Sequence, residues 1–311
     1  MNVLVTGASG FTGTWMLEYL HSLNRQDINL VGLVNTGMPK NKDAPWIRLV
    51  KADLLDPVHL ATTLSTIDPD MIIHLAGRHL GTLSNLLEIN VIGTKNLLDA
   101  AIRKNSECRI IVISSSAVYG YPGKIPISEE LPCRPLSEYG ISKSAQEILS
   151  HMYYQVYGAH IAVVRPFNLI GPGQPSSFIC GKIIHQAMQI SRGKRESIDL
   201  LETFSSRDFI DVRDTVKGYW ALITQPHFER ECSGKIFNLG SGLAHSVKDI
   251  IELIEEIAGQ HYLVSLPEKK PCILIPTQHS DNRKIQSLTG WMPEISLRDS
   301  LKDMLDEGRP S

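Results

Sequence analysis

Short apolar runs alternate with amphipathic stretches along the first half of the chain. The apolar runs predict strands at Asn2–Thr6, Ile28–Leu33, Ile47–Ala52, Met71–Ala76, Arg109–Ser114 and His160–Arg165. The stretches between them carry apolar residues three and four positions apart, which predicts helices at Phe11–Asn24, Pro57–Leu64, Leu83–Lys104 and Ser142–Tyr157. Strands that alternate with helices are joined by right-handed crossovers, so the pattern predicts an α/β fold with a doubly wound parallel (Rossmann) sheet.

The pattern changes after Gly171-Pro172-Gly173, which interrupts the regular alternation. The remainder shows helical stretches with isolated short strands. We expect residues 1–170 to form the Rossmann domain and residues 171–311 to form a second, smaller α/β lobe. The segment 208–224 again has the pattern of a strand followed by a helix, and we expect it to return to the first domain.

Composition argues against several classes of protein. The 311 residues carry a formal net charge of −2, which does not favour nucleic-acid binding, and no apolar run is long enough to span a membrane. The five cysteines are scattered without a CxxC pair, which argues against a disulfide framework and a zinc ribbon. We therefore expect a cytoplasmic protein that binds no metal, nucleic acid or membrane.

The first predicted strand runs directly into a glycine-rich turn. The turn reads Gly7-Ala8-Ser9-Gly10-Phe11-Thr12-Gly13, with the spacing GxxGxxG, and a predicted helix follows. The pyrophosphate of a dinucleotide needs close approach to the backbone and the positive end of a helix, and this arrangement offers both. The candidate cofactor-binding residues of the turn are Gly7, Ser9, Gly10, Phe11, Thr12 and Gly13.

The end of the second predicted strand bears on which dinucleotide is used. An acidic residue there would bind the ribose diol of NAD, and a basic one would bind the 2′-phosphate of NADP. The sequence has Asn35-Thr36 at that place, with Lys40 and Lys42 slightly further on. Asn35 is a candidate for cofactor contact, and the choice between NAD and NADP stays open.

Tyr139 and Lys143 form a YxxxK pair at the start of a predicted helix, with both side chains on one face. A free tyrosine has a pKa of about 10, and a neighbouring ammonium group lowers it. We therefore expect Lys143 to lower the pKa of Tyr139 and so prepare it for proton transfer. Lys143 could also bind the nicotinamide ribose.

Taken together, these motifs resemble the extended short-chain dehydrogenases/reductases, the NAD-dependent epimerase/dehydratase family, over nearly the whole chain. Ala52-Asp53-Leu54 is similar to the family's adenine-contacting segment, and Ile73-His74-Leu75-Ala76-Gly77 to the segment that lines the cofactor. Asn90 resembles the structural asparagine of the family's central helix. The resemblance implies cofactor contacts from Asp53, Leu54, Leu75, Ala76, Gly77, Asn90, Ile113 and Pro166, in addition to Tyr139 and Lys143.

The resemblance also implies a catalytic serine. Counting back from Val118-Tyr119-Gly120 puts Ser115 where the family keeps a serine or threonine at a strand end. Its hydroxyl could bridge the substrate oxygen and Tyr139. In the related 4,6-dehydratases acidic residues follow that position, whereas this chain has Ser116 and Ala117, which argues against a dehydratase.

The segment Arg165–Gln174, with the sequence RPFNLIGPGQ, is similar to the corresponding segment of GDP-4-keto-6-deoxy-D-mannose reductases. Residues 144–147, 207–214 and 289–293 carry further likenesses. The likeness implies a nucleotide-sugar substrate bound by Ser115, Ser116, Asn168, Gln174, Arg207 and Lys270. Departures occur at Ala117, at Leu169 and in the turn Gly77–Gly81, so the sugar and the base stay open.

Three functions are compatible with these residues. The first is a nucleotide-sugar 4-ketoreductase that transfers a hydride to C4 of a 4-keto-6-deoxyhexose. The second is a nucleotide-sugar 4-epimerase, which uses the same side chains but retains its cofactor. The third is a non-catalytic dinucleotide sensor or scaffold, which the presence of Ser115, Tyr139 and Lys143 disfavours. By analogy with this fold we also expect a homodimer.

Overall fold

The computed structural model describes residues 1–37, 44–268 and 274–307. Its main sheet has seven parallel strands in the order β10-β6-β5-β4-β1-β2-β3. The strand order reverses between β1 and β4, which confirms the predicted doubly wound α/β fold. The strands are β1 (Asn2–Thr6), β2 (Asn29–Val34), β3 (Arg48–Lys51), β4 (Met71–His74), β5 (Arg109–Ile113), β6 (Ile161–Pro166) and β10 (Ile236–Leu239).

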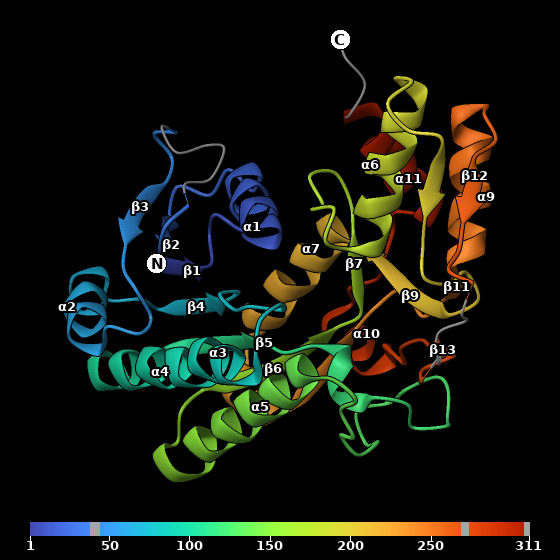
Figure 1. Cartoon of the computed structure of the whole chain (residues 1–311). Helices are drawn as coiled ribbons and strands as arrows, with labels where there is room; N and C mark the ends of the chain where they lie inside the picture. The colour runs from blue at the N-terminus through green and yellow to red at the C-terminus, as the bar shows by residue number, and fades with distance from the viewer. Residues whose placement is uncertain (38–43, 269–273, 308–311) are drawn as a thin grey trace.

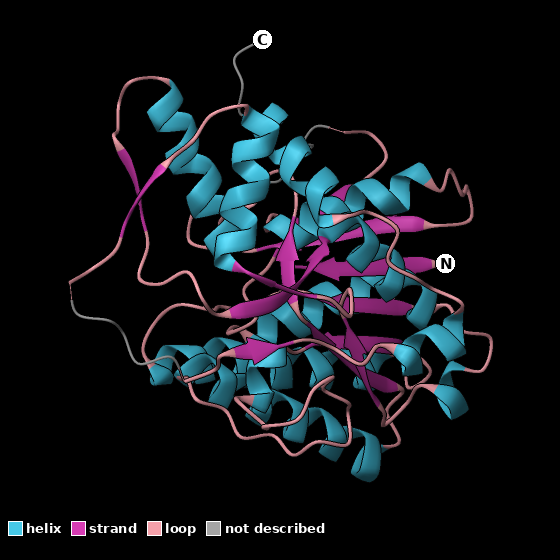
Figure 2. Cartoon of the chain, turned by 90° about the vertical axis from the view of Figure 1, so that its right-hand side faces the viewer, coloured by secondary structure: helices cyan, strands magenta, loops and turns pink. Residues whose placement is uncertain are grey.

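Helices cover both faces of this sheet, giving three layers (Figures 1 and 2). One face carries α1 (Phe11–Ser22), α7 (Val212–Ile223), α8 (Phe228–Glu231) and α10 (Arg283–Thr289). The other carries α2 (Pro57–Ile67), α4 (Gly93–Lys104) and α5 (Glu138–Tyr157). The strands buried between the two layers are mostly apolar, as the hydrophobic runs in the sequence predict, and their buried polar side chains include Thr6, His74 and Arg165.

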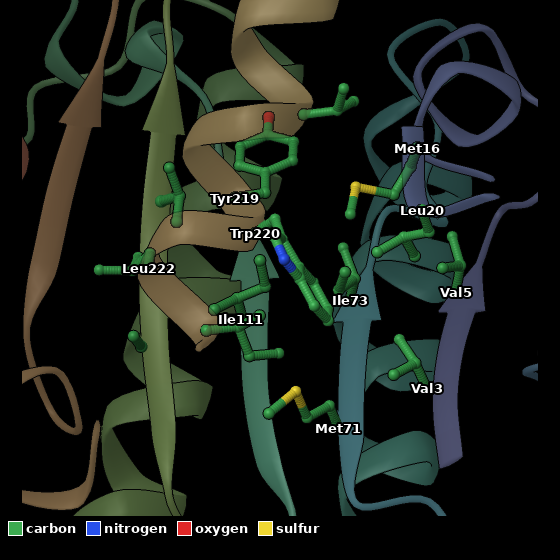
Figure 3. Packing of buried hydrophobic residues seen from close by; sticks show 14 of the residues in the cluster. Val3, Val5, Met16, Leu20, Met71, Ile73, Ile111, Tyr219, Trp220 and Leu222 are labelled. Atoms are coloured by element: carbon green, nitrogen blue, oxygen red, sulfur yellow. The ribbon is translucent and has the colours of Figure 1, made fainter. Parts of the chain in front are cut away.

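Helix α7 comes from the second half of the chain yet packs into the core of the first half. Trp220 extends from α7 toward Ile73 of β4, and Met16 and Leu20 of α1 lie nearby (Figure 3). All four side chains are buried. Burying such side chains contributes roughly 1.5–3 kcal/mol each, so this contact holds α7 firmly against the sheet.

A smaller lobe follows β6. Its main sheet has the order β11-β9-β13, with β7 also paired to β9, and β8 pairs with β12 separately. Three helices of this lobe share one apolar core. Its elements are β7 (Asn168–Ile170), α6 (Ile179–Ser191), β8 (Ser197–Asp199), β9 (Ser206–Asp211), β11 (Ala244–Ser246), α9 (Val247–Ala258), β12 (Leu263–Ser265), β13 (Thr277–Gln278) and α11 (Leu297–Glu307).

The two lobes exchange segments more than once. Of the segment 208–224, helix α7 packs on the large sheet, whereas β9 belongs to the small one. Strand β10, which the sequence pattern did not assign to the Rossmann domain, pairs with β6 as the seventh strand. A single division at residue 171 therefore does not separate the lobes along the chain.

Two local differences from the predicted helices bear on the site. Helix α5 begins at Glu138, earlier than predicted, because the Ser137 hydroxyl accepts a hydrogen bond from the Gly140 amide at 3.1 Å and caps it. The predicted helix at Leu83–Lys104 consists of α3 (Leu83–Leu87), a π-helical segment at Glu88–Ile92, and α4. Within the described ranges, no helix combines the length and hydropathy of a membrane span.

Candidate active site

A cavity of about 680 Å³ lies where the carboxyl ends of the central strands meet the smaller lobe. This is the place where a doubly wound sheet binds its ligand. Most of the residues predicted for the site line this cavity. They are Gly7, Gly10, Phe11, Thr12, Gly13, Leu75, Gly77, Ile113, Ser115, Ser116, Tyr139, Lys143, Pro166, Asn168, Gln174 and Arg207.

The glycine turn is shaped for close approach by a ligand. Gly7 has a positive φ of +66°, and a Cβ there would lie 2.8 Å from the Ala76 nitrogen. A Cβ on Gly13 would overlap the Gly7 carbonyl oxygen. The turn leads directly into the N-terminus of α1, where free backbone N–H groups carry partial positive charge. Its geometry therefore fits the pyrophosphate of a dinucleotide.

Ser115, from the segment after β5, and Tyr139 and Lys143, from α5, come together at this cavity. The Ser115 hydroxyl lies near the Tyr139 phenol, and its oxygen accepts a hydrogen bond from the Ala117 amide at 3.1 Å. Tyr139 and Lys143 lie one helical turn apart on α5. The arrangement places a phenol, a hydroxyl and an ammonium group around one point of the cavity wall.

Lys143 is held by protein groups on its buried side. Its ammonium nitrogen donates to the Ile113 carbonyl at 2.7 Å and to Oε1 of Gln146 at 2.9 Å. A lysine ammonium has three hydrogens, so one remains for a ligand in the cavity. Gly77 is needed opposite, because a Cβ there would lie 3.4 Å from the Lys143 nitrogen and 2.9 Å from Oδ1 of Asn90.

The expectation that Lys143 lowers the pKa of Tyr139 is not what the structure shows. Burial raises the pKa of Tyr139 to about 12, and the hydrogen bond from Ser115 only partly opposes this rise. Burial also lowers the pKa of Lys143 to about 8, against the opposing charge of Glu147. The sequence-based expectation counted the ammonium charge and omitted desolvation, which is the larger effect here. Tyr139 is therefore a protonated phenol at neutral pH.

Cationic side chains face the cavity, and no carboxylate among the described residues lines it. Arg207, Arg78 and Lys143 contribute the positive charge. Burial lowers the pKa of Arg207, which donates to the Ser206 carbonyl at 2.9 Å. The two neighbouring aspartates are occupied elsewhere, since Asp208 accepts bonds from residues 241, 242 and 280 and Asp211 pairs with Arg213. The Arg207 fork is thus available to an anionic ligand.

The other predicted substrate residues differ in how free their side chains are. The Asn168 amide donates to the Asp208 carbonyl at 3.0 Å, which leaves its oxygen for a ligand. Gln174 donates to the Leu169 carbonyl and accepts from the Gly181 amide at 2.9 Å, so it mainly fixes its own loop. Ser116 is buried at the cavity wall. Lys270 lies outside the described residues, as do Lys40 and Lys42.

Six predicted cofactor residues do not line the cavity: Ser9, Asn35, Asp53, Leu54, Ala76 and Asn90. Ser9, Asn35 and Asp53 lie at the carboxyl ends of β1, β2 and β3, at the same sheet edge, and remain predictions. Asn90 is fully buried, and its amide bonds both backbone groups of Arg78 and the Ser142 hydroxyl. Its role in the structure is to hold the loop after β4.

The sequence reasoning missed Gln278 and Tyr219 at the cavity, whereas His79 was a candidate from the turn Gly77–Gly81. Gln278 reaches from β13 to the Ser116 and Gly120 carbonyls, at 3.3 and 3.2 Å. Tyr219 of α7 is buried beside the cavity, and its hydroxyl has no hydrogen-bond partner among the described residues. His79 stacks on Phe178, with ring centroids 4.6 Å apart, and links the loop after β4 to the smaller lobe. No local motif marks Gln278 or Tyr219.

Comparisons with known proteins agree with this geometry. The family model described as GDP-mannose 4,6 dehydratase matches residues 4–304. GDP-6-deoxy-D-mannose reductase from Pseudomonas aeruginosa is 31% identical over 98% of this chain and 96% of the relative.

Solved structures are similar over the same length. The structure of RMD from Pseudomonas aeruginosa complexed with NADPH has a TM-score of 0.84 and 29% identity, covering 99% of this chain and 98% of that one. UDP-glucuronic acid 4-epimerase from Bacillus cereus, in complex with UDP-glucuronic acid and NAD, has a TM-score of 0.86 and 26% identity, covering 99% of each chain. The chain therefore belongs to the GDP-mannose 4,6-dehydratase family, within the extended short-chain dehydrogenases/reductases.

Proposed function

We propose that the chain is an NAD(P)-dependent nucleotide-sugar 4-ketoreductase, acting on a substrate similar to GDP-4-keto-6-deoxymannose. The observation that carries the proposal is one cavity that joins the glycine turn, the Ser115, Tyr139 and Lys143 side chains, and Arg207, with no carboxylate among its described lining. The GDP-6-deoxy-D-mannose reductase relative supports this assignment.

Tyr139 acts as the acid in this reaction. Bound NAD(P)H supplies the hydride to C4 of the sugar. Tyr139, protonated because burial raises its pKa to about 12, delivers its proton to the oxygen at C4. The Ser115 hydroxyl, beside Tyr139, directs its single hydrogen to the same substrate oxygen while negative charge develops there. Lys143 directs its third hydrogen toward the cofactor ribose and stabilises the phenolate that Tyr139 becomes.

Arg207 and Asn168 hold the substrate. A nucleotide-sugar carries a diphosphate, whose oxygens match the planar fork of a guanidinium group. Arg207 is the cavity cation whose neighbouring carboxylates already have other partners. The Asn168 oxygen lies at the same wall, close to Leu169 and Phe209. The residues of the glycine turn would hold the pyrophosphate of the cofactor, and Lys143 would hold its ribose.

The alternative is a nucleotide-sugar 4-epimerase. It needs the same three side chains, and the Bacillus cereus epimerase supports it as a relative of similar fold. An epimerase first removes a proton from the sugar hydroxyl, which requires Tyr139 as a phenolate. Reduction begins instead from the phenol form of Tyr139, and the two activities also differ in the fate of the cofactor.

The two activities are separated by cofactor stoichiometry. The purified protein should oxidise one NADPH or NADH for each 4-keto sugar reduced, measured by cofactor absorbance with a panel of GDP-, UDP-, dTDP- and CDP-linked sugars. Tyr139→Phe should abolish turnover while dinucleotide binding is retained. Tightly bound NAD in the purified protein, with interconversion of 4-epimers and no net cofactor consumption, would establish the epimerase instead.

We further propose that the chain forms a homodimer through α5. Ile141, Ile148, Met152 and Val156 are exposed on this helix at spacings of seven and four, which places them on one stripe. An exposed apolar stripe of this kind marks a contact surface. Ile148→Glu should convert the dimer to a monomer in analytical ultracentrifugation, whereas the control Leu263→Glu, on the equally exposed β12, should not.

A further inference from the structure

The ammonium group of Lys143 is the end of a buried chain of hydrogen bonds. Its partner Gln146 donates from Nε2 to the Thr94 hydroxyl at 2.7 Å. Thr94 in turn donates to the Asn90 carbonyl at 2.7 Å, and its oxygen also contacts Nε2 of His74 at 2.9 Å. Gln146, Thr94, Asn90 and His74 are all 0–1% exposed. These hydrogen bonds connect α5 through α4 to strand β4.

The chain of hydrogen bonds continues to β1, the strand that leads into the glycine turn. Nδ1 of His74 lies 2.7 Å from the hydroxyl of Thr6, the last residue of β1. The Thr6 oxygen also accepts a bond from the Ala76 amide at 3.2 Å. Gly7, the first residue of the turn, follows Thr6 directly. Lys143 and the cofactor turn are therefore linked by side chains as well as by the sheet.

The donors and acceptors can be assigned in only one consistent way. Because Thr94 uses its single hydrogen on Asn90, its oxygen must accept from both Gln146 and His74. His74 therefore carries its proton on Nε2 and accepts from Thr6 on Nδ1. A neutral histidine fits this assignment, since burial and the charge of Lys143 lower the pKa of His74 to about 3.

We infer that Gln146, Thr94 and His74 are positioning residues that fix the direction of the Lys143 ammonium relative to the glycine turn. The inference rests on the proposed function, in which Lys143 holds the cofactor ribose. Thr94 is the central member, because its oxygen is the shared acceptor of Gln146 and His74. Without this oxygen, both buried donors lose their partner and Gln146 is free to rotate away from Lys143.

Three threonine variants test the inference. Thr94→Val removes the hydroxyl at nearly constant volume, and Thr94→Ser keeps it. Thr215→Val is the matched control, because Thr215 is also fully buried in a helix and, among the described residues, its hydroxyl bonds only the Asp211 carbonyl, at 3.0 Å. Thermal unfolding sets a temperature at which all variants are folded, and kcat and KM are then measured for the sugar and for the dinucleotide.

Thr94→Val should lower kcat by about 10- to 100-fold, as expected when a reacting group is misplaced, while KM for the sugar stays close to that of the parent. Thr94→Ser should restore kcat, and Thr215→Val should leave it unchanged. Equal kcat values for Thr94→Val and Thr94→Ser would overturn the inference. A loss of kcat in Thr215→Val as large as that in Thr94→Val would also overturn it, because any buried threonine would then have the same effect.

A second pair covers the case in which Thr94→Val does not fold. Gln146→Glu keeps an oxygen for the Lys143 ammonium, whereas Gln146→Met of similar length does not. Gln146→Met should lose turnover and Gln146→Glu should retain more of it, and equal activities would contradict the inference. If the parent reduces no sugar, the proposed function fails by itself. The dissociation constant of NAD(P) then tests the inference, and Thr94→Val should bind the dinucleotide more weakly than Thr94→Ser does.

Discussion

Replacing Glu147 by glutamine should lower the free energy of unfolding by about 3 kcal/mol. Glu147 lies one turn beyond Lys143 on α5 and forms a two-pronged ion pair with Arg165 of β6, through bonds of 2.9 and 2.6 Å. The two side chains are only 7% and 3% exposed. Ser114 also donates to the Glu147 carboxylate. Nearly the whole charge of this pair is therefore sheltered from water.

The magnitude follows from what the variant leaves behind. Removing one partner of a buried ion pair costs about 3–5 kcal/mol, because the other charge stays buried without compensation. Glutamine keeps one acceptor oxygen for Arg165, and the Tyr119 ring lies 4.6 Å from the guanidinium carbon, so the lower end of that range applies. One guanidinium nitrogen of Arg165 already lacks a hydrogen-bond partner among the described residues, so few other groups can compensate the Arg165 charge when the carboxylate is lost.

Equilibrium unfolding in urea, followed by circular dichroism, measures the loss. With a slope of about 3 kcal/mol per molar urea, the midpoint should fall by about 1 M. Glu252→Gln is the control, because its ion pair with Lys248 is mostly exposed and should contribute little. A loss below about 1 kcal/mol in Glu147→Gln would refute the reasoning, since it would mean that water reaches the Arg165 charge.

Four further outcomes follow from the same structure. Because burial lowers the pKa of Lys143 to about 8, the rate of ketone reduction should fall as the pH rises through about 8. The Glu147 charge raises the pKa of Lys143, so Glu147→Gln should move this fall in rate to lower pH. The same lowered pKa means that, as the pH rises, Lys143 loses its proton in the folded state before it does in the unfolded state. Lys143 should therefore make the free energy of unfolding increase between about pH 8 and the usual lysine pKa of 10.5, which thermal midpoints measured across this range would show. Arg207→Met should raise KM for the nucleotide-sugar by about 10- to 100-fold with a smaller change in kcat. Gly13→Ala should abolish dinucleotide binding in a fluorescence titration, because its Cβ would overlap the Gly7 carbonyl.

The sequence predicts the large sheet well because the information is local. Each strand of the first half is a short apolar run, and the predicted limits of those strands lie within two residues of the observed ones. Strand β10 was missed because Ile236–Leu239 is a short isolated run that gains its place only by pairing with β6, far away in sequence. The π-helical segment around Asn90 was missed because the apolar spacing there is still compatible with a regular helix.

The residues of the candidate site likewise fall into those that a local motif predicts and those that only the fold brings to the cavity. The glycine turn and the YxxxK pair are local motifs, so their residues could be predicted to face one ligand. Gln278 and Tyr219 reach the cavity only because β13 and α7 come back to it from the second half of the chain. The pKa of Tyr139 was predicted in the wrong direction because spacing along a helix reveals the neighbouring charge but not the degree of burial.

Membership in a family named for a dehydratase does not make this chain one. Elimination of water across C5 and C6 of a hexose requires a base that removes a proton from carbon, and the resemblance drawn from the sequence implies carboxylates after the catalytic hydroxyl residue of a 4,6-dehydratase. Here Ser116 and Ala117 occupy those positions at the cavity wall. No carboxylate among the described residues lines the cavity. The Ser115 hydroxyl and the Tyr139 phenol at the cavity can instead pass a proton to or from an oxygen of the substrate. This is the basis on which we propose hydride transfer at C4, without elimination of water, for this site.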